Sequence, residues 1–218
     1  MDGIQLSICI ATLNRAAFIG ETLESIVTQL TDEVEIVVVD GASTDQTGEI
    51  VKSFAARFPR LRYLRLEQKG GVDQDYCKTV DMARGEYCWL FPDDDLLKPG
   101  AVAAVLAATR KNYSLIVVNA EVRSVDLSAC LQPSRVRFTE DRIYATEAPA
   151  RNQLLADVGN YLSFIGGVVI RRDIWNQREK ERYLGTVFIH LGVLFQSPLP
   201  GNALAIAHPW ITIRYGNA

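Results

Sequence analysis

The chain has 218 residues, of which 48% are hydrophobic and 22% charged, as is typical of a soluble globular protein with one sizeable core. Its net charge of −3 gives no support for electrostatic capture of nucleic acid. The four cysteines are widely separated and lack CxxC spacing, which argues against zinc or a disulfide framework and fits a reducing cytoplasm.

Strand-like and helix-like segments alternate over the first 120 residues. Apolar, β-branched runs predict strands, and apolar residues at helical spacing predict helices between them. The predicted strands are 6–11, 34–39, 61–66, 87–91 and 115–119, and the predicted helices are 18–30, 50–58, 73–83 and 101–108. This alternation predicts an α/β fold with a mostly parallel sheet covered by helices on both faces.

The second half of the chain is less regular. Its pattern predicts a strand at 135–138, a helix at 150–158, a strand at 166–170 and a helix at 173–181. No repeat or linker separates the halves, so we expect one domain over 1–218, with halves 1–120 and 121–218. The chain stops just after the strand-like run 211–213, which leaves open that it is C-terminally truncated.

The N-terminal sequence and the lengths of the apolar segments bear on where the protein is located. The N-terminus lacks a basic region followed by a long apolar stretch, so no signal peptide is expected. No window approaches the roughly 20 apolar residues of a membrane span. A peripheral membrane role stays open.

Polar residues follow each of the first four predicted strands. The carboxyl ends of parallel strands meet at one edge of a sheet, where ligands bind in open α/β folds. These residues are Thr12, Asn14 and Arg15; Asp40, Ser43, Thr44 and Asp45; Lys69, Gly70, Gly71, Asp73 and Asp75; and Asp93, Asp94 and Asp95.

The three consecutive carboxylates of Asp93, Asp94 and Asp95 are the strongest single signal. Adjacent carboxylates repel one another unless a cation sits among them, and their oxygens suit Mg²⁺ or Mn²⁺. The alternative is an acidic turn in which Asp95 caps a helix that begins at Leu96.

Single residues in the other loops allow two interpretations each. Asp40 could accept hydrogen bonds from a base or ribose, or form an Asx turn. Arg15 and Lys69 could bind phosphate, or be solvated surface groups. Asp45 is expected to cap a helix. The phosphate-binding glycine motifs of dinucleotide-binding folds and P-loop proteins are missing, so a nucleotide phosphate would need a metal.

Three motifs, in this order and spacing, resemble those of a known family. They are residues 7–15, residues 37–45, and residues 83–87 running into the aspartates at 93–95. Together they resemble the family 2 glycosyltransferases of the GT-A fold. The stretch from Gly70 to the aspartates is similar, more narrowly, to the abequosyltransferase-like branch, which is associated with bacterial O-antigen (lipopolysaccharide) assembly.

The resemblance implies a GT-A-like three-layer sandwich that binds a nucleotide-diphosphate sugar. It implies that Asp93 and Asp95 match the outer positions of the D-x-D motif and hold Mg²⁺ or Mn²⁺ against the diphosphate, with Asp95 also taking a catalytic part. The metal would neutralise charge on the departing nucleoside diphosphate. The remaining donor-binding candidates are Thr12, Asn14, Arg15, Asp40, Ser43, Lys69, Gly71, Asp73, Asp75 and Asp94.

The sequence departs from the family pattern in its second half. Family 2 enzymes usually carry an acidic general base there, but the matching region, 185–192, has no carboxylate. His190 occupies roughly that place and could deprotonate an acceptor hydroxyl, or could be a core residue. His208, the other histidine, is expected to pack. We expect 166–172 and 183–191 to form the acceptor side.

We therefore predict a metal-dependent glycosyltransferase that adds a sugar to a glycan or lipid-linked saccharide, without nucleic-acid partners. It would be cytoplasmic, free or at the inner face of the cytoplasmic membrane. One alternative is a noncatalytic nucleotide-sugar or glycan-binding domain, favoured by the missing acidic base. Another is a nucleotidyltransferase, disfavoured because its basic glycine-rich loop after the first strand is absent.

Overall fold

One mixed β-sheet organises residues 3–145 and 147–217, the part of the chain that this computed structural model describes. The strands are β1 (Leu6–Thr12), β2 (Val34–Asp40), β3 (Leu61–Arg65), β4 (Tyr87–Phe91), β5 (Leu96–Leu97), β6 (Leu115–Ser124), β7 (Cys130–Gln132), β8 (Arg142–Tyr144), β9 (Val168–Arg171) and β10 (Ala203–Tyr215). The α-helices are α1 (Ile19–Val27), α2 (Thr47–Arg57), α3 (Val72–Met82), α4 (Ala101–Thr109), α5 (Ala148–Val158), α6 (Arg172–Asn176) and α7 (Ile189–Phe195). The 3₁₀ turns are η1 (Tyr161–Ser163), η2 (Ile165–Gly167) and η3 (Glu181–Tyr183).

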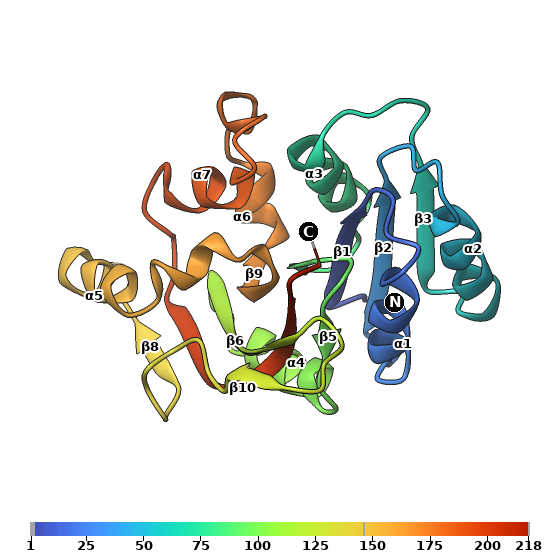
Figure 1. The fold of residues 1–218 in the computed structure, drawn as a ribbon. Helices are drawn as coiled ribbons and strands as arrows, with labels where there is room; N and C mark the ends of the chain where they lie inside the picture. Colours follow the sequence, from blue (N-terminus) through green and yellow to red (C-terminus); the bar gives the residue numbers. More distant parts are fainter. Residues whose placement is uncertain (1–2, 146, 218) are drawn as a thin grey trace.

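The first half of the chain forms a parallel arrangement, in the order β3-β2-β1-β4. Thr12 pairs with Asp40, and Ile10 with Phe91, so the loops after β1, β2 and β4 start at nearly the same level. Right-handed crossovers carry the chain from β1 to β3 in one direction and back to β4 in the other. Figure 1 accordingly shows α3 on the opposite side of these strands from α1 and α2.

The second half extends the same sheet with antiparallel strands. β9 lies between β4 and β6 and is antiparallel to both, while β10 is parallel to β6 and antiparallel to β5 and β8. The predicted α/β architecture with a mostly parallel central sheet is therefore confirmed, and strands from both halves of the chain share one sheet.

Burial follows from the composition of the strands. Every residue of β1, β2 and β4 is buried, as expected for continuous apolar runs covered on both faces. The core is one cluster that includes the large side chains of Trp89, Trp175 and Tyr87. This rigid layer fixes the strand ends on which the polar loops sit.

Two predicted elements of the second half differ in the structure: one is wrong, and one is shortened. Residues 135–138 form no strand. The Arg135 amide donates to the Ala120 carbonyl of β6, but the amides of Arg135 and Val136 also donate to the Asn119 side chain, which interrupts regular strand pairing. The helix expected at 173–181 is replaced by the short α6 and by η3. The buried Arg178 guanidinium, between these two, donates to the carbonyls of Val193 and Pro198.

The turn after the aspartates also differs from the alternative in which a helix begins there. Leu96 and Leu97 form β5, which pairs with Thr212 and Ile211 of β10. Asp95 therefore caps no helix.

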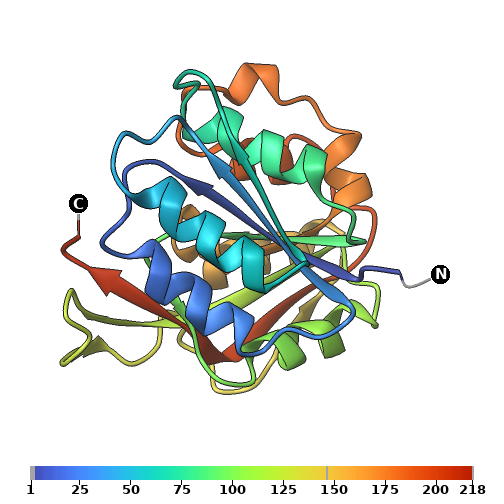
Figure 2. The same ribbon diagram turned by 90° about the vertical axis from the view of Figure 1, so that its right-hand side faces the viewer.

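Figure 2 shows the last residues of the chain on the side toward which the β1 arrow points. The end of the described chain thus lies at the carboxyl ends of the parallel strands. Among the described residues, no helix combines the length and apolar character needed to cross a bilayer.

Candidate functional site

A cleft of about 450 Å³ lies at the carboxyl ends of β1 and β4 and the start of α3. This volume is within the range of small-molecule sites. Several of its residues belong to the predicted set: Thr12, Arg15, Lys69, Gly71, Asp75, Asp93 and Asp94. The remaining lining residues, which the sequence did not single out, are Ala11, Leu13, Val72, Tyr76 and Pro92. We call this site the acidic cleft.

Arg15 is the cation that faces the aspartates. Its Nε lies 3.5 Å from Asp93 Oδ1, and its Nη2 lies 3.9 Å from Asp94 Oδ2. The backbone amide of Arg15 donates to the Thr47 hydroxyl at 2.8 Å, which fixes the loop to the start of α2. One guanidinium therefore serves two carboxylates at distances longer than those of tight, hydrogen-bonded ion pairs.

The buried aspartates have too little positive charge nearby to offset their desolvation and mutual repulsion. Desolvation and the neighbouring Asp94 charge raise the pKa of Asp93 to about 6, although Arg15 acts in the opposite direction. Desolvation, with the Asp94 and Asp93 charges, raises the pKa of Asp95 to about 8. A cation bound between these groups would favour their ionised forms, so their shared environment suits a cationic ligand.

The three aspartates do not face the same way. Asp93 and Asp94 line the acidic cleft, whereas Asp95 Oδ1 accepts the backbone amide of Arg214 at 2.8 Å. Asp94 Oδ2 also accepts the Asn217 side chain at 2.7 Å. The end of β10 and the residues after it thus form part of the wall behind the aspartates.

Whether a divalent metal fits this site depends on the side chains near Arg15 that could coordinate it. In the described ranges 3–145 and 147–217, no group of three or more His, Cys, Asp and Glu side chains is arranged to hold a metal by itself. Three carboxylates do line the cleft, and two of them, Asp93 and Asp94, are adjacent in the chain. Mg²⁺ commonly takes one or two protein carboxylates and completes its shell with phosphate oxygens and water. The residues present fit a metal that arrives with a phosphate ligand.

The loop after β2 supports the cleft without lining it. Asp40 is fully buried, and its oxygens accept the Ser43 amide at 2.7 Å and the Tyr63 hydroxyl at 2.8 Å. Asn14 has a positive φ of 54°, and its side chain accepts the Thr44 amide at 2.8 Å. Asp40, Asn14 and Ser43 thus take part in hydrogen bonds that hold together the loops after β1 and β2. None of these three residues lines the acidic cleft.

Asp45 holds the same loop at the start of α2. Its Oδ1 accepts the Thr47 amide at 3.0 Å, and its Oδ2 accepts the Ala16 amide at 3.1 Å. The N-cap residue of α2 is Gln46, so Asp45 lies one residue before the capping position that the sequence predicted for it.

Asp75 faces the cleft from α3 with one free oxygen. It is only 3% exposed, and its Oδ1 has no hydrogen-bond partner among the described residues. A Cβ at Gly41 would lie 2.5 Å from Asp75 Oδ2, so this close approach requires glycine there. Desolvation and the Asp40 charge raise the pKa of Asp75 to about 6, against the opposing effect of Lys69. A buried acceptor of this kind is suited to a ligand N–H or O–H group.

Asp73 points away from the cleft and holds the other half of the protein. Its oxygens accept the amides of Val187 at 2.9 Å and Ile189 at 3.3 Å, at the N-terminus of α7. Val187 has a positive φ of 59°, which is strained for a β-branched residue. Asp73 thus brings a carboxylate from α3 to the 185–192 region, where it caps the N-terminus of α7.

His190 lies on α7, and its ring centroid is 6.2 Å from that of Phe188. Its Nε2 lies 2.9 Å from the Leu162 carbonyl, which can only accept, so Nε2 carries the proton and Nδ1 has the free lone pair. Desolvation lowers the pKa of His190, and the ring is therefore neutral near pH 7. Nδ1 is buried and has no hydrogen-bond partner among the described residues, and His190 does not line the acidic cleft.

His208, by contrast, is exposed and lies against Trp210, with ring centroids 4.2 Å apart. This packing contact is the one expected from the sequence.

Comparison with known proteins identifies the family. The model of the family described as "Glycosyl transferase family 2" matches residues 7–175. Abequosyltransferase RfbV of Salmonella typhimurium is 26% identical over 97% of this chain and 67% of its own length. Glycosyltransferase GlyG of Streptococcus pneumoniae is 29% identical over 52% of the chain and 38% of its own length.

Solved structures agree on the fold. TarS 1-349 of S. aureus in complex with UDP has a TM-score of 0.75 and 21% identity, over 97% of this chain and 61% of that chain. The same protein in complex with UDP-GlcNAc has a TM-score of 0.72 and 19% identity, over 98% of this chain and 59% of that chain. The chain thus spans about three fifths of these structures and about two thirds or less of the curated relatives it matches. At this identity the likeness establishes the GT-A fold.

Proposed function

The chain belongs to glycosyltransferase family 2, and from this premise we propose that it transfers a sugar from a nucleotide-diphosphate donor to a saccharide acceptor. The observation that carries the proposal is the acidic cleft, in which Arg15, Asp93 and Asp94 face one another at the ends of the first and fourth parallel strands. Ligands of open α/β sheets bind at this edge.

We propose that Asp93 and Asp94 would hold Mg²⁺ or Mn²⁺ together with the donor's diphosphate. Bound there, the metal would supply charge neutralisation for the departing nucleoside diphosphate. Arg15 and Lys69, which line the same cleft, would bind diphosphate oxygens. The predicted partner of Asp93 is Asp95, but Asp94 lines the acidic cleft and Asp95 does not, so Asp94 is the better candidate.

Asp75 is proposed to bind the nucleoside part of the donor. Its unpaired Oδ1 would accept a hydrogen bond from a base or ribose group that enters the cleft. Asp40 would act one step further away, by holding the loop after β2 through Ser43 and Tyr63.

The transfer itself breaks the bond between the anomeric carbon and the phosphate oxygen and forms one to an acceptor oxygen. The acceptor hydroxyl loses its proton to a general base, for which we propose His190 Nδ1. The nucleoside diphosphate keeps the bonding electrons of the broken C–O bond.

The likeness to an abequosyltransferase supports a finer proposal about the acceptor. We propose that the product belongs to a bacterial surface polysaccharide such as an O-antigen, assembled on a lipid carrier. The enzyme would then work at the inner face of the cytoplasmic membrane, as a peripheral protein.

A donor panel tests the proposed function. UDP-, GDP-, CDP- and dTDP-sugars would be compared by thermal shift with and without Mn²⁺, followed by donor hydrolysis without acceptor. A bound donor at a hundredfold excess over Kd should stabilise the fold by about 2.7 kcal/mol. Stabilisation without hydrolysis would favour the noncatalytic binding domain, whereas no response to any donor contradicts the proposal.

A further inference from the structure

A second polar pocket, of about 650 Å³, lies between α5, η1 and the segment 132–142. Three arginines line it, namely Arg135, Arg137 and Arg142, together with the polar side chains of Gln132, Ser134 and Asn160. We call it the arginine pocket. It shares no lining residue with the acidic cleft.

The arginine pocket has an excess of positive charge. Its one carboxylate, Asp157, lies 2.7 Å from Arg142 and also accepts the Tyr144 hydroxyl and the Gln153 side chain. Arg135 donates only to the neutral Gln132 side chain, and Arg137 has no ion pair among the described residues. Two guanidinium groups are thus unneutralised in a protein whose overall charge is −3. Their planar forks suit phosphate oxygens.

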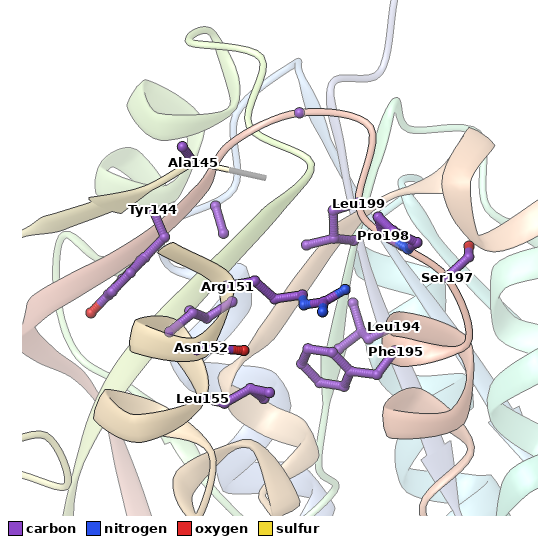
Figure 3. Close-up of a pocket in the computed structure, with 13 residues that line it drawn as sticks. Tyr144, Ala145, Arg151, Asn152, Leu155, Leu194, Phe195, Ser197, Pro198 and Leu199 are labelled. Atoms are coloured by element: carbon purple, nitrogen blue, oxygen red, sulfur yellow. The ribbon is translucent and has the colours of Figure 1, made fainter. Parts of the chain in front are cut away.

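A mainly apolar pocket of about 300 Å³ adjoins the arginine pocket, and Leu155 lines both. Figure 3 shows this apolar pocket, with Leu155 and Tyr144 on one side, Phe195 and Leu199 on the other, and Arg151 between them. Its polar lining residues are Arg151, Asn152 and Ser197, and the others are apolar or aromatic. A mainly apolar site and a phosphate-type site thus meet at Leu155.

Packed side chains connect the arginine pocket with the acidic cleft. Tyr161 lines the pocket, and its ring centroid lies 5.8 Å from that of Phe164. Phe164 packs against Gly166, where a Cβ would lie 2.4 Å from the Phe164 ring and 2.9 Å from Pro92 Cδ. Pro92 lines the acidic cleft directly before Asp93. Packed residues thus join the arginine pocket to Gly166, where the predicted acceptor side begins.

We propose that the arginine pocket binds the phosphate or diphosphate of a lipid-linked acceptor and that the apolar pocket takes the first carbons of its lipid chain. This assignment rests on the proposed function, and it adds the place and the chemistry of acceptor binding. A volume of about 650 Å³ exceeds what a free phosphate needs and fits a phosphate with an attached group. The apolar pocket supplies the reason for a lipid attachment.

Calorimetric titration with two soluble probes tests the proposal, with the whole chain in EDTA so that no metal draws a diphosphate into the acidic cleft. The probes are inorganic pyrophosphate and decyl diphosphate below its micellar concentration. Decyl diphosphate should bind more tightly, since each buried methylene adds roughly fourfold. The double variant Arg135→Gln/Arg137→Gln should weaken both probes about 10- to 100-fold.

Two further variants make the result specific. Arg84→Gln removes one positive charge from an exposed site outside both pockets and should change neither affinity. Leu155→Gln should remove most of the advantage of decyl diphosphate over pyrophosphate while sparing pyrophosphate itself. Nucleotide binding by the double variant should equal that of the wild type, which also shows that the variant is folded.

Three results would overturn the assignment. These are unchanged affinity in the folded double variant, equal affinity for the two probes, or binding of phosphatidylglycerol vesicles without binding of soluble decyl diphosphate. Failure of the proposed function has a different signature, because the protein would then bind no nucleotide-sugar while the two probes remain measurable.

Discussion

The acidic cleft and the arginine pocket both suit phosphate groups, but with opposite local charge. In the cleft, the carboxylates of Asp93 and Asp94 share one guanidinium at 3.5 and 3.9 Å. In the pocket, three arginines accompany a single carboxylate, that of Asp157, which pairs with Arg142 alone. A diphosphate would therefore be repelled from the first site until a cation is added and attracted to the second site without one.

Because of this difference, the two sites suit two different tasks, and a single charge arrangement would not serve both equally well. A site whose affinity depends on a mobile cation can hold a donor diphosphate and then release it as a charged product. A site with fixed guanidinium groups can hold one anchor throughout transfer. The comparison predicts that metal removal and arginine removal have separate effects.

Removal of the cleft carboxylates has the largest expected effect. Asp94→Ala or chelation by EDTA should reduce sugar transfer by about 10³-fold or more, because the leaving diphosphate loses its charge neutralisation. Initial-rate assays across a Mn²⁺ titration would measure this, with Asp81→Ala on the exposed side of α3 as control. Decyl diphosphate affinity should stay the same. Full transfer in EDTA would remove the distinction between the two sites.

The same assay on Asp95→Ala decides which carboxylate partners Asp93. Asp95 is held by the Arg214 amide, and its pKa is raised to about 8 by burial and by its neighbours Asp94 and Asp93. Loss of transfer in Asp95→Ala but not in Asp94→Ala would restore the assignment expected from the sequence.

The next largest effect is expected at His190, on α7. α7 begins at the Asp73 carboxylate and ends with Leu194 and Phe195 in the apolar pocket. His190→Ala should reduce transfer by about 10²- to 10⁴-fold while donor affinity is retained, as expected for loss of a general base. Rates and nucleotide titrations would be measured together.

His208→Ala is the matched control, since this exposed histidine packs on Trp210 outside both pockets and should leave transfer unchanged. A structural histidine would behave differently at position 190. The variant would lose melting temperature and donor affinity alongside activity. Transfer within a few-fold of wild type, in a folded His190→Ala protein, removes it from the mechanism.

A smaller effect is expected at Asp73, which joins α3 to the start of α7. Asp73→Ala removes the acceptor for the Val187 and Ile189 amides and should lower the free energy of unfolding by about 1–2 kcal/mol, as for loss of a helix cap. Urea unfolding would measure this, with Asp81→Ala on the same helix as control. Asp73→Asn keeps one acceptor oxygen and should lose less. Equal stability of all three variants would show that the cap carries no energy.

The sequence predicts the acidic cleft well because local signals determine it. Apolar β-branched runs such as 34–39 set the strands, and parallel pairing brings the loops after β1 and β4 together. What each side chain contacts is a different matter. Asp73 and Asp75 are two residues apart on α3, yet one caps α7 and the other faces the cleft. Their spacing alone could not separate these roles.

The second half was harder to predict because tertiary contacts decide it. The segment 135–138 follows the Asn119 side chain, and α6 ends before the buried Arg178. The arginine pocket is assembled from residues 132–142 and 155–161, which no spacing rule links. The sequence pattern singled out none of its arginines, because their pairing depends on where Asp157 lies in the fold.

The smallest predicted effect concerns Asp75, whose charge makes the cleft more acidic and whose pKa is raised to about 6 by burial and the Asp40 charge. Because the folded state favours the protonated form, the contribution of Asp75 to stability is fully present below about pH 4 and is lost as the pH rises through 6. Asp75→Asn cannot ionise. Its stability relative to wild type should therefore increase between pH 4 and 6, reaching on the order of 1 kcal/mol at pH 7.5, less than the full shift because Lys69 and solvent screen the charge.

Urea unfolding of both proteins at pH 4 and pH 7.5 measures this difference, and Asp81→Asn, at an exposed site, should show no such trend. The same substitution should weaken nucleotide binding, since an amide oxygen is a poorer acceptor than a carboxylate for a donor N–H or O–H group. A variant that gains stability and loses nucleotide affinity identifies Asp75 as a group kept for binding at a cost in folding. If the stability difference is the same at both pH values, Asp75 is ionised without penalty, and the acidic character of the cleft then rests on Asp93 and Asp94 alone.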